Sequence, residues 1–198
     1  MTLRPWFHEV REQIADTSVF QLHRVRARSP RTGQYRTFSV LDAGDWVNVI
    51  ALTAEREVVL VRQFRHGTVD FTLEVPGGMV DRGESPAQAA IRELREESGY
   101  AGDEAEKLGE VTPNPALFNN RCHTYLVENC RRSHELELDH SEDIEVMTRP
   151  LSDIPGIIAS GGIHHALVIC AFWWLAQSRP SLLRPSEFIS SSFGTPTK

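Results

Sequence analysis

The sequence predicts an α/β fold, and three observations support this prediction. Several short runs rich in β-branched and aromatic residues alternate apolar with polar side chains, as strands do. Residues 85–99 carry helix signals at both ends, and residues 151–161 and 163–178 show two further helical patterns. With 198 residues, of which 40% are hydrophobic, the chain is long enough for one domain with a full core.

The first 45 residues are predicted to form a short helix followed by a β-hairpin. The helix is expected over residues 3–14. Residues 18–28 and 35–43 then alternate apolar and polar side chains around a spacer that holds Pro30 and Gly33. Because proline and glycine favour turns, the two runs are expected to pair as antiparallel strands.

The main sheet is predicted to come from the middle of the chain. Residues 46–53 and 57–64 are β-branched runs joined by a polar turn, which indicates two more antiparallel strands. Further strands are expected at residues 71–76, 106–113, 122–129 and 144–150.

The helix that begins after Ser85 is the clearest element of the sequence. Ser85 is the expected N-cap, Pro86 fits the first helical position and Gln88 completes a capping box. Gly99 supplies the stop at the other end.

Composition limits the classes of function and location. The formal net charge of −6 argues against a nucleic-acid-binding surface, whereas small anionic ligands remain possible if a cation mediates. Three cysteines without zinc-type spacing indicate a reducing compartment. The charged N-terminal segment and the short apolar run after His165 match neither a secretory signal nor a membrane span, so a cytoplasmic location is expected.

Three glutamates crowd one edge of the predicted helix. At about 100° per residue, Glu93 and Glu97 lie one turn apart, with Glu96 about 60° to one side. They border an apolar stripe that consists of Ala87, Ala90, Ile91 and Leu94. A solvated helix face with an Arg92–Glu96 pair is the plain alternative, but carboxylates gathered in this way favour a shared hard cation such as Mg²⁺ or Mn²⁺.

The loop before the helix strengthens the cation hypothesis. Gly77, Gly78 and Gly83 allow a tight bend, and the carbonyl of Gly77 or Gly78 is free to face the same ion. The pattern of Gly78, five residues, Glu84, seven residues and RELREESGY at 92–100 resembles the complete box of the Nudix hydrolase family.

This resemblance implies a fold, a set of ligands and a reaction. The fold is an α/β/α sandwich with a mixed β-sheet, here preceded by the N-terminal antiparallel hairpin. Glu93 and Glu97 become the principal metal ligands, and Glu96 becomes a further ligand or a support through water. The Gly77 carbonyl is one more contact, while Arg92 and Glu84 orient the loop and the helix. The reaction is hydrolysis of a nucleoside diphosphate linked to another group by a metal-activated water.

The flanks of the box are similar to the ADP-ribose pyrophosphatase branch of the family. Residues 58–84 match its Gln-x-Arg strand end and its acidic-x-Pro entry to the box. Substrate contacts are therefore implied for Arg65, where a guanidinium suits a diphosphate, and for Glu74, which also suits a structural partner of an arginine. Pro115, fifteen residues after the box, and Arg36 on the N-terminal hairpin are implied as further substrate contacts.

The general base is left open by the sequence. Residues 140–146 resemble the late acidic loop of these enzymes, in which Glu142 takes a metal-binding position. His140 stands where some relatives carry a glutamate base. His140, Glu142, Asp143 and a metal-bound hydroxide therefore all remain candidates.

The resemblance predicts a Mg²⁺-dependent enzyme that splits ADP-ribose, or a related nucleoside diphosphate sugar, into a nucleoside monophosphate and a sugar phosphate. Dinucleoside polyphosphates are the alternative substrates, and a non-catalytic module that binds a nucleotide metabolite is the alternative function. The expected domains are residues 1–45, which serve dimerisation, residues 46–178, which form the Nudix domain, and a flexible tail at 179–198. A homodimer through the N-terminal strands is expected, without nucleic acid or membrane as a partner.

Overall fold

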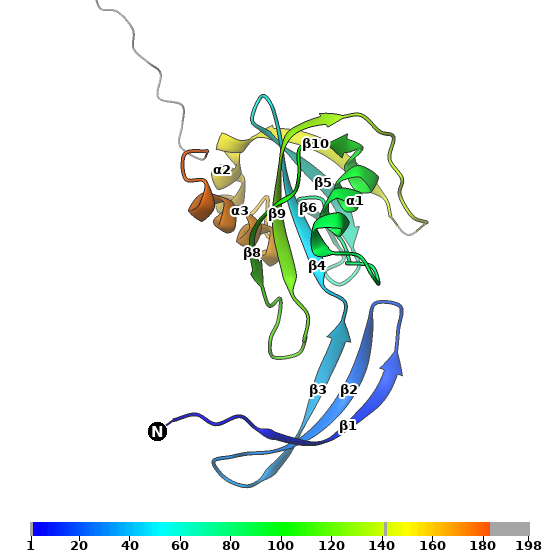
Figure 1. Cartoon of the computed structure of the whole chain (residues 1–198), viewed down its shortest axis with the longest axis vertical. Coiled ribbons are helices and arrows are strands. Elements are labelled where there is room, and N and C mark those ends of the chain that lie inside the picture. Colours follow the sequence, from blue (N-terminus) through cyan, green and yellow to red (C-terminus); the bar gives the residue numbers. More distant parts are fainter. Residues whose placement is uncertain (1, 141, 183–198) are drawn as a thin grey trace, which may run out of the picture.

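The computed structural model describes residues 2–140 and 142–182, which form a sandwich with a separate N-terminal arm (Figure 1). The strands are β1 Phe7–Asp16, β2 Phe20–Arg28, β3 Tyr35–Ala43, β4 Trp46–Thr53, β5 Glu57–Arg65, β6 Asp70–Glu74, β7 Tyr100–Ala101, β8 Glu106–Val111, β9 Cys122–Arg132 and β10 Ile144–Pro150. The helices are α1 Pro86–Ser98, α2 Ile154–Ala159 and α3 Ala166–Ser178, and a short 3₁₀ helix covers Leu151–Asp153.

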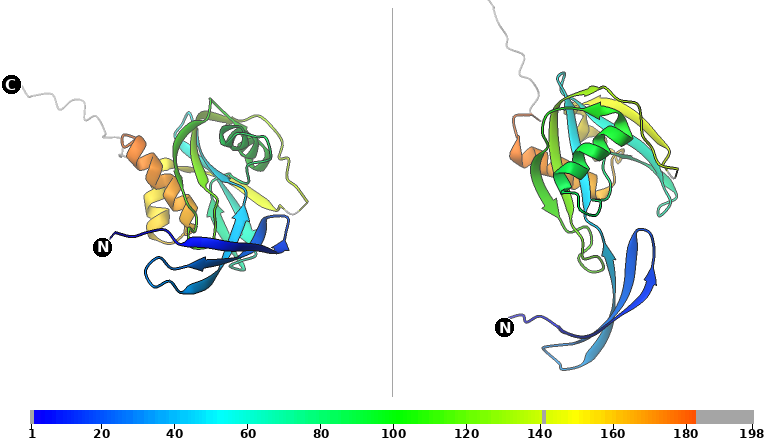
Figure 2. Two further views of the ribbon diagram at one scale, coloured as in Figure 1. Left: turned by 60° about the horizontal axis from the view of Figure 1, so that its bottom comes forward. Right: turned by 45° about the vertical axis from the view of Figure 1, so that its right-hand side comes forward.

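The arm is a three-stranded antiparallel sheet in the order β1-β2-β3. It extends away from the body, and its last strand leads into β4 (Figure 2). The pairing of β2 with β3 confirms the predicted hairpin. The predicted helix at 3–14 is wrong, because residues 7–16 form β1, which pairs with β2 through a register broken at two places.

The body contains a mixed sheet with the strand order β10-β5-β4-β9-β7. Strands β4 and β9 are parallel, whereas the other pairs are antiparallel, and β6 and β8 add to β5 and β9. Strands β4 and β5 pair only at Leu52 and Val58 and then diverge. Residues 76–80 lie against β4 beyond that point, since Val49 and Val47 donate backbone hydrogen bonds to Pro76 and Gly78.

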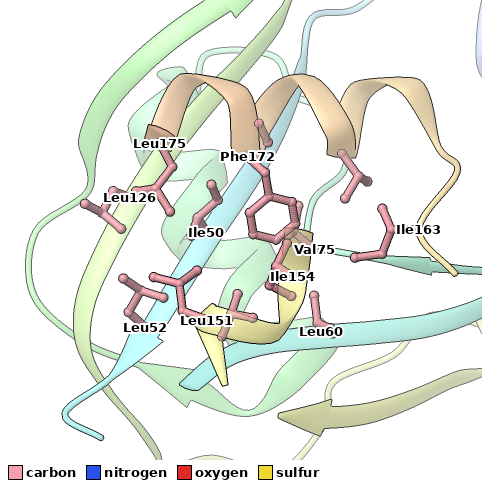
Figure 3. Packing of buried hydrophobic residues seen from close by; sticks show 13 residues of the cluster. Ile50, Leu52, Leu60, Val75, Leu126, Leu151, Ile154, Ile163, Phe172 and Leu175 are labelled. Carbon is pink, nitrogen blue, oxygen red and sulfur yellow. The ribbon is translucent and has the colours of Figure 1, made fainter. Parts of the chain in front are cut away.

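Helices cover both faces of this sheet and bury two apolar clusters. Ile50 and Leu52 of β4 pack with Phe172 and Leu175 of α3 on one face, as Figure 3 shows. Their sequence neighbours Val47, Val49 and Ala51 point to the opposite face, where they pack with Ala89, Ala90 and Leu94 of α1. The alternation of one central strand therefore builds both cores, and the predicted α/β/α sandwich is confirmed.

Helix α1 begins and ends where the sequence predicts. Ser85 Oγ accepts the Gln88 amide and Gln88 Oε1 accepts the Ser85 amide, which completes the capping box, and Gly99 adopts a left-handed conformation at φ 73°. The predicted apolar stripe is wrong in one respect, because Ile91 is 40% exposed. The buried side of the helix instead includes Glu93 and Glu97.

The C-terminal segment contains the two predicted helices in shorter form. The second of them, α3, starts at Ala166, so that His165 is its N-cap residue and His164 precedes it. The predicted flexible tail lies outside the described residues from residue 183 onward. Within the described ranges, no helix combines the length and apolar character that crossing a membrane requires.

Candidate active site

Two glutamates of α1 are buried where the helix meets the glycine loop. Only 8% of Glu93 and 3% of Glu97 is exposed, whereas Glu96 is half-buried. Leu94, which is fully buried in the core, sets the rotation of the helix and thereby directs the two acids inward. Glu93 and Glu97 thus share the buried side of the helix, whereas Glu96 lies closer to the surface.

Gly77 and Gly78 allow the loop to lie between β4 and these acids. A Cβ atom on Gly77 would come within 2.1 Å of the Val47 carbonyl oxygen, so a side chain does not fit against this strand. A Cβ atom on Gly78 would come within 2.3 Å of Glu93 Oε1. The Gly77 amide also donates a 2.8 Å hydrogen bond to Glu97 Oε2. Loop and carboxylates are thus in direct contact.

Arg92 links the remaining acids to the loop. Its guanidinium donates two 3.0 Å hydrogen bonds to the carboxylate of Glu84 and one to the Met79 carbonyl. It also contacts Glu93 at 2.9 Å and Glu96 at 3.0 Å. This geometry agrees with an orienting role for Arg92 and Glu84, because the guanidinium is occupied by the protein itself.

The carboxylates repel one another in a poorly solvated place. Burial, together with the charges of Glu93 and Glu142, raises the pKa of Glu97 to about 8 despite the Gly77 hydrogen bond. Burial also raises the pKa of Glu93, against the opposing effect of Arg92. Such sites hold a proton or a cation in preference to an uncompensated negative charge.

Arg65 and Glu74 form an ion pair at the ends of β5 and β6. Nε and one terminal nitrogen of Arg65 each donate a 2.7 Å hydrogen bond to Glu74, which is 4% exposed. Thr72 Oγ1 donates to the same carboxylate, a contact that strand alternation indicates because residues 72 and 74 share a face. The hydrogen bonds to Glu74 outweigh burial and raise the pKa of Arg65, and the charges of Glu97 and Glu142 add to this effect, so the guanidinium lies within electrostatic reach of these acids.

Glu142 belongs to the loop before β10, which is attached to the C-terminal end of α1. Its carboxylate accepts the Asp139 amide at 3.0 Å, and the Glu137 amide donates to the Glu96 carbonyl at 3.0 Å. Its charge acts on Glu93 and Glu97, whereas His140 is exposed in the same loop.

Two residues that the sequence predicts as substrate contacts, Arg36 and Pro115, lie on elements that do not carry the acids. Arg36 is exposed on β3, near the end of the arm that is remote from the body. Pro115 is exposed in the loop between β8 and β9. A cavity of about 590 Å³ adjoins that loop, and its walls include Glu110, Thr112 and Arg121 but none of the predicted site residues.

The acid cluster fits a hard divalent cation by its chemistry. In the described part of the chain, no three His, Cys, Asp or Glu side chains already stand in a closed metal-binding arrangement. Nevertheless, two buried carboxylates with raised pKa values lie against a glycine loop whose backbone approaches them closely. Carboxylate and carbonyl oxygens are the ligands that Mg²⁺ and Mn²⁺ prefer.

A glycine loop and a glutamate-rich helix thus lie beside a mixed sheet that is covered by helices on both faces. The model of the NUDIX domain family matches residues 44–165, which is more than half of the chain. The chain therefore belongs to the Nudix family and is a Nudix hydrolase.

Its relatives include enzymes that act on ADP-containing compounds. The chain is 30% identical to the ADP-ribose pyrophosphatase of Bacillus subtilis, over 83% of this chain and 89% of that protein. It is 39% identical to the ADP-sugar pyrophosphatase of Mus musculus, over 48% of each chain. A crystal structure of an ADP compounds hydrolase superposes with a TM-score of 0.80 at 20% identity, covering 91% of this chain and 97% of that one, which shows the shared fold.

Replacing Glu74 tests the energetic importance of its pair with Arg65. We expect Glu74→Gln to lower the free energy of unfolding by about 2 kcal/mol at pH 7, because a buried charge-assisted pair is lost while Arg65 keeps some access to water. The Arg65 hydrogen bonds outweigh burial and hold the pKa of Glu74 below its ordinary value of 4.5. The stabilisation is therefore present above pH 4.5 and is lost as the pH falls through the lower folded-state pKa.

Urea denaturation of the wild type and the variant as a function of pH measures this difference. Glu145→Gln is the matched control, because the Arg62–Glu145 pair is 3.4 Å long and exposed. The control is expected to change the free energy of unfolding by less than about 0.5 kcal/mol. Equal losses in the two variants, or a Glu74 effect that persists unchanged at low pH, would contradict the assignment.

Proposed function

We propose that the protein hydrolyses the diphosphate linkage of ADP-ribose or a related nucleoside diphosphate sugar, giving a nucleoside monophosphate and a sugar phosphate. The observation that carries the proposal is the contact of buried Glu93 and Glu97 with the glycine loop, next to the Arg65–Glu74 pair. A diphosphate binds both divalent cations and guanidinium groups, so an acid cluster that holds a cation next to an arginine suits this ligand. The relatives named above support the ADP-containing class of substrate.

Glu93, Glu97 and the Gly77 carbonyl would hold Mg²⁺ or Mn²⁺, with Glu96 and Glu142 as further contacts. A bound divalent cation supplies charge neutralisation for the diphosphate and lowers the pKa of a water. Arg92 holds the helix and the glycine loop against each other, which keeps the acids close to the loop carbonyls.

Arg65 would bind the diphosphate or the terminal sugar. Because Nε and one terminal nitrogen already contact Glu74, the remaining terminal nitrogen is oriented in advance for a substrate oxygen. Glu74 then acts through Arg65 and not on the substrate. The residue that accepts the proton from water is to be sought in the 139–143 loop, where His140 is exposed and Glu142 acts electrostatically on the acids.

The protein is further proposed to act as a homodimer through its arm. The arm carries several exposed large apolar side chains, which rarely gather on a free surface. They include Phe7, Val10, Ile14, Tyr35 and Phe38. A second chain that covers this sheet would also bring its Arg36 toward another body, which would give this residue the substrate contact that it does not make within one chain.

A substrate panel tests the reaction. With Mg²⁺ present, we expect ADP-ribose to give the highest kcat/KM among ADP-ribose, other nucleotide sugars, dinucleoside polyphosphates and nucleoside triphosphates, with AMP and ribose 5-phosphate as products. Removing divalent cations with EDTA should abolish turnover, and adding Mg²⁺ back should restore it. Preference for another nucleotide sugar would replace the substrate, whereas binding without turnover of any compound would favour a nucleotide-binding module.

Glu97→Gln tests the acid cluster. Turnover is expected to fall about a thousandfold, because a buried cation ligand becomes neutral while the shape of the side chain is retained. Glu55→Gln, in the exposed turn after β4, is the control and should keep wild-type activity. Circular dichroism checks that both variants fold. Near-normal turnover of Glu97→Gln in saturating Mg²⁺ would refute its role as a ligand.

Light scattering after gel filtration tests the dimer. We expect a mass of about twice the 22.3 kDa of the chain. Val10→Asp in β1 should reduce the mass toward that of one chain, whereas Trp173→Asp, at an exposed apolar position on α3, should leave it unchanged. A monomeric wild type would refute both the proposed dimer and the proposed substrate contact of Arg36.

A further inference from the structure

The connection between the arm and the body is only two residues long, Gly44 and Asp45, yet it is held at several points. The Asp45 carboxylate accepts the Arg121 amide at 2.8 Å through one oxygen, and its other oxygen lies 3.0 Å from His123 Nε2. His123 is 6% exposed. Burial alone would raise the pKa of Asp45, but these hydrogen bonds outweigh it and hold the pKa below the usual range.

The end of β3 is fixed by the same loop that precedes His123. Asn119 donates from Nδ2 to Asp42 at 2.7 Å and accepts the Ala43 amide at 3.2 Å. Asn120 donates to the Gly44 carbonyl at 2.9 Å, and Leu41 donates its amide to the Leu117 carbonyl at 2.8 Å. A short glycine-containing connection would ordinarily serve as a hinge, but here it is tied along its whole length to residues 117–123.

The other side of Asp45 contacts the glycine loop of the active site. The Asp45 carbonyl accepts the Val80 amide at 2.9 Å, and Trp46 forms an isolated β-bridge with Met79. The Met79 carbonyl in turn accepts a hydrogen bond from Arg92, which contacts Glu93. Hydrogen bonds and the short backbone segment Met79–Val80 therefore connect the arm through Asp45 to Arg92 and Glu93.

We propose that Asp45 is a positioning residue for the glycine loop, and that it couples the setting of the arm to the binding of a cation by Glu93 and Glu97. The cation part rests on the proposed function. Asp45 contacts neither the acids nor the substrate site directly, so its effect passes through the backbone of residues 77–80. A second chain that displaces the arm would then change the cation affinity of Glu93 and Glu97 without touching either acid.

Hydrogen exchange of the metal-free protein tests the structural half of this coupling. Asp45→Asn should speed exchange of the Val80 amide about tenfold, because residue 45, whose carbonyl accepts this amide, loses the carboxylate that holds it in place. Asp45→Ala should have a larger effect. Asp103→Asn is the matched control, because this exposed aspartate accepts a side-chain hydrogen bond from Asn129 at another loop. Wild-type exchange at Val80 in both Asp45 variants would overturn the proposal.

Calorimetric titration with Mn²⁺, without substrate, tests the functional half. Asp45→Asn and Asn119→Ala should each weaken Mn²⁺ binding about fivefold, although Asn119 touches only the arm side of the connection. Asp103→Asn should bind as the wild type does. A purely structural role predicts a lower melting temperature with unchanged affinity of the folded protein, and that result would overturn the coupling.

The two proposals fail in distinguishable ways. Absence of Mn²⁺ binding by the wild type would refute the acid cluster as a cation site and with it the coupling to the cation, whatever the exchange rates show. If the wild type binds Mn²⁺ and both Asp45→Asn and Asn119→Ala bind it with the same affinity, the coupling alone is overturned and the proposed hydrolysis stays intact.

Discussion

The geometry of the site depends on one guanidinium, that of Arg92. Three glutamates within two turns of one helix repel one another, and burial increases the cost of their charges. Arg92 contacts Glu84, Glu93 and Glu96 at the same time and also the backbone of the preceding loop. It therefore offsets the repulsion and fixes the distance between helix and loop with one side chain, while Glu97 keeps only partial compensation.

The second constraint is the early separation of β4 from β5. Because the two strands pair only at Leu52 and Val58, a position beside the central strand is left for residues 76–80. The glycine loop thus has the backbone partners of a strand although it has the bend of a loop. Its rigidity comes from β4, which is buried on both faces, and functional groups held by such an element keep their positions accurately.

The elements that the sequence predicts well have local signals, and the others depend on distant contacts. Helix α1 has its cap, its stop and its acids within residues 85–99, so its bounds and the position of its acids could both be predicted. Residues 7–16 space their apolar side chains like a helix because two irregularities interrupt the strand alternation, and only pairing with β2 reveals a strand. Ile91 fits an apolar stripe on the helical wheel, but the rotation of the helix is set by the core. No sequence signal relates Asp45 to His123, since the parallel pairing of β4 with β9 brings them together.

The two adjacent glycines of the loop differ in what a side chain would disturb. At Gly77 an added Cβ meets backbone, which has no room to move, whereas at Gly78 it meets the flexible end of Glu93. Alanine at position 78 would therefore leave the fold in place and push aside a carboxylate. Positions 78 and 93 therefore share one space, because the observed conformer of the Glu93 side chain requires that residue 78 has no Cβ atom.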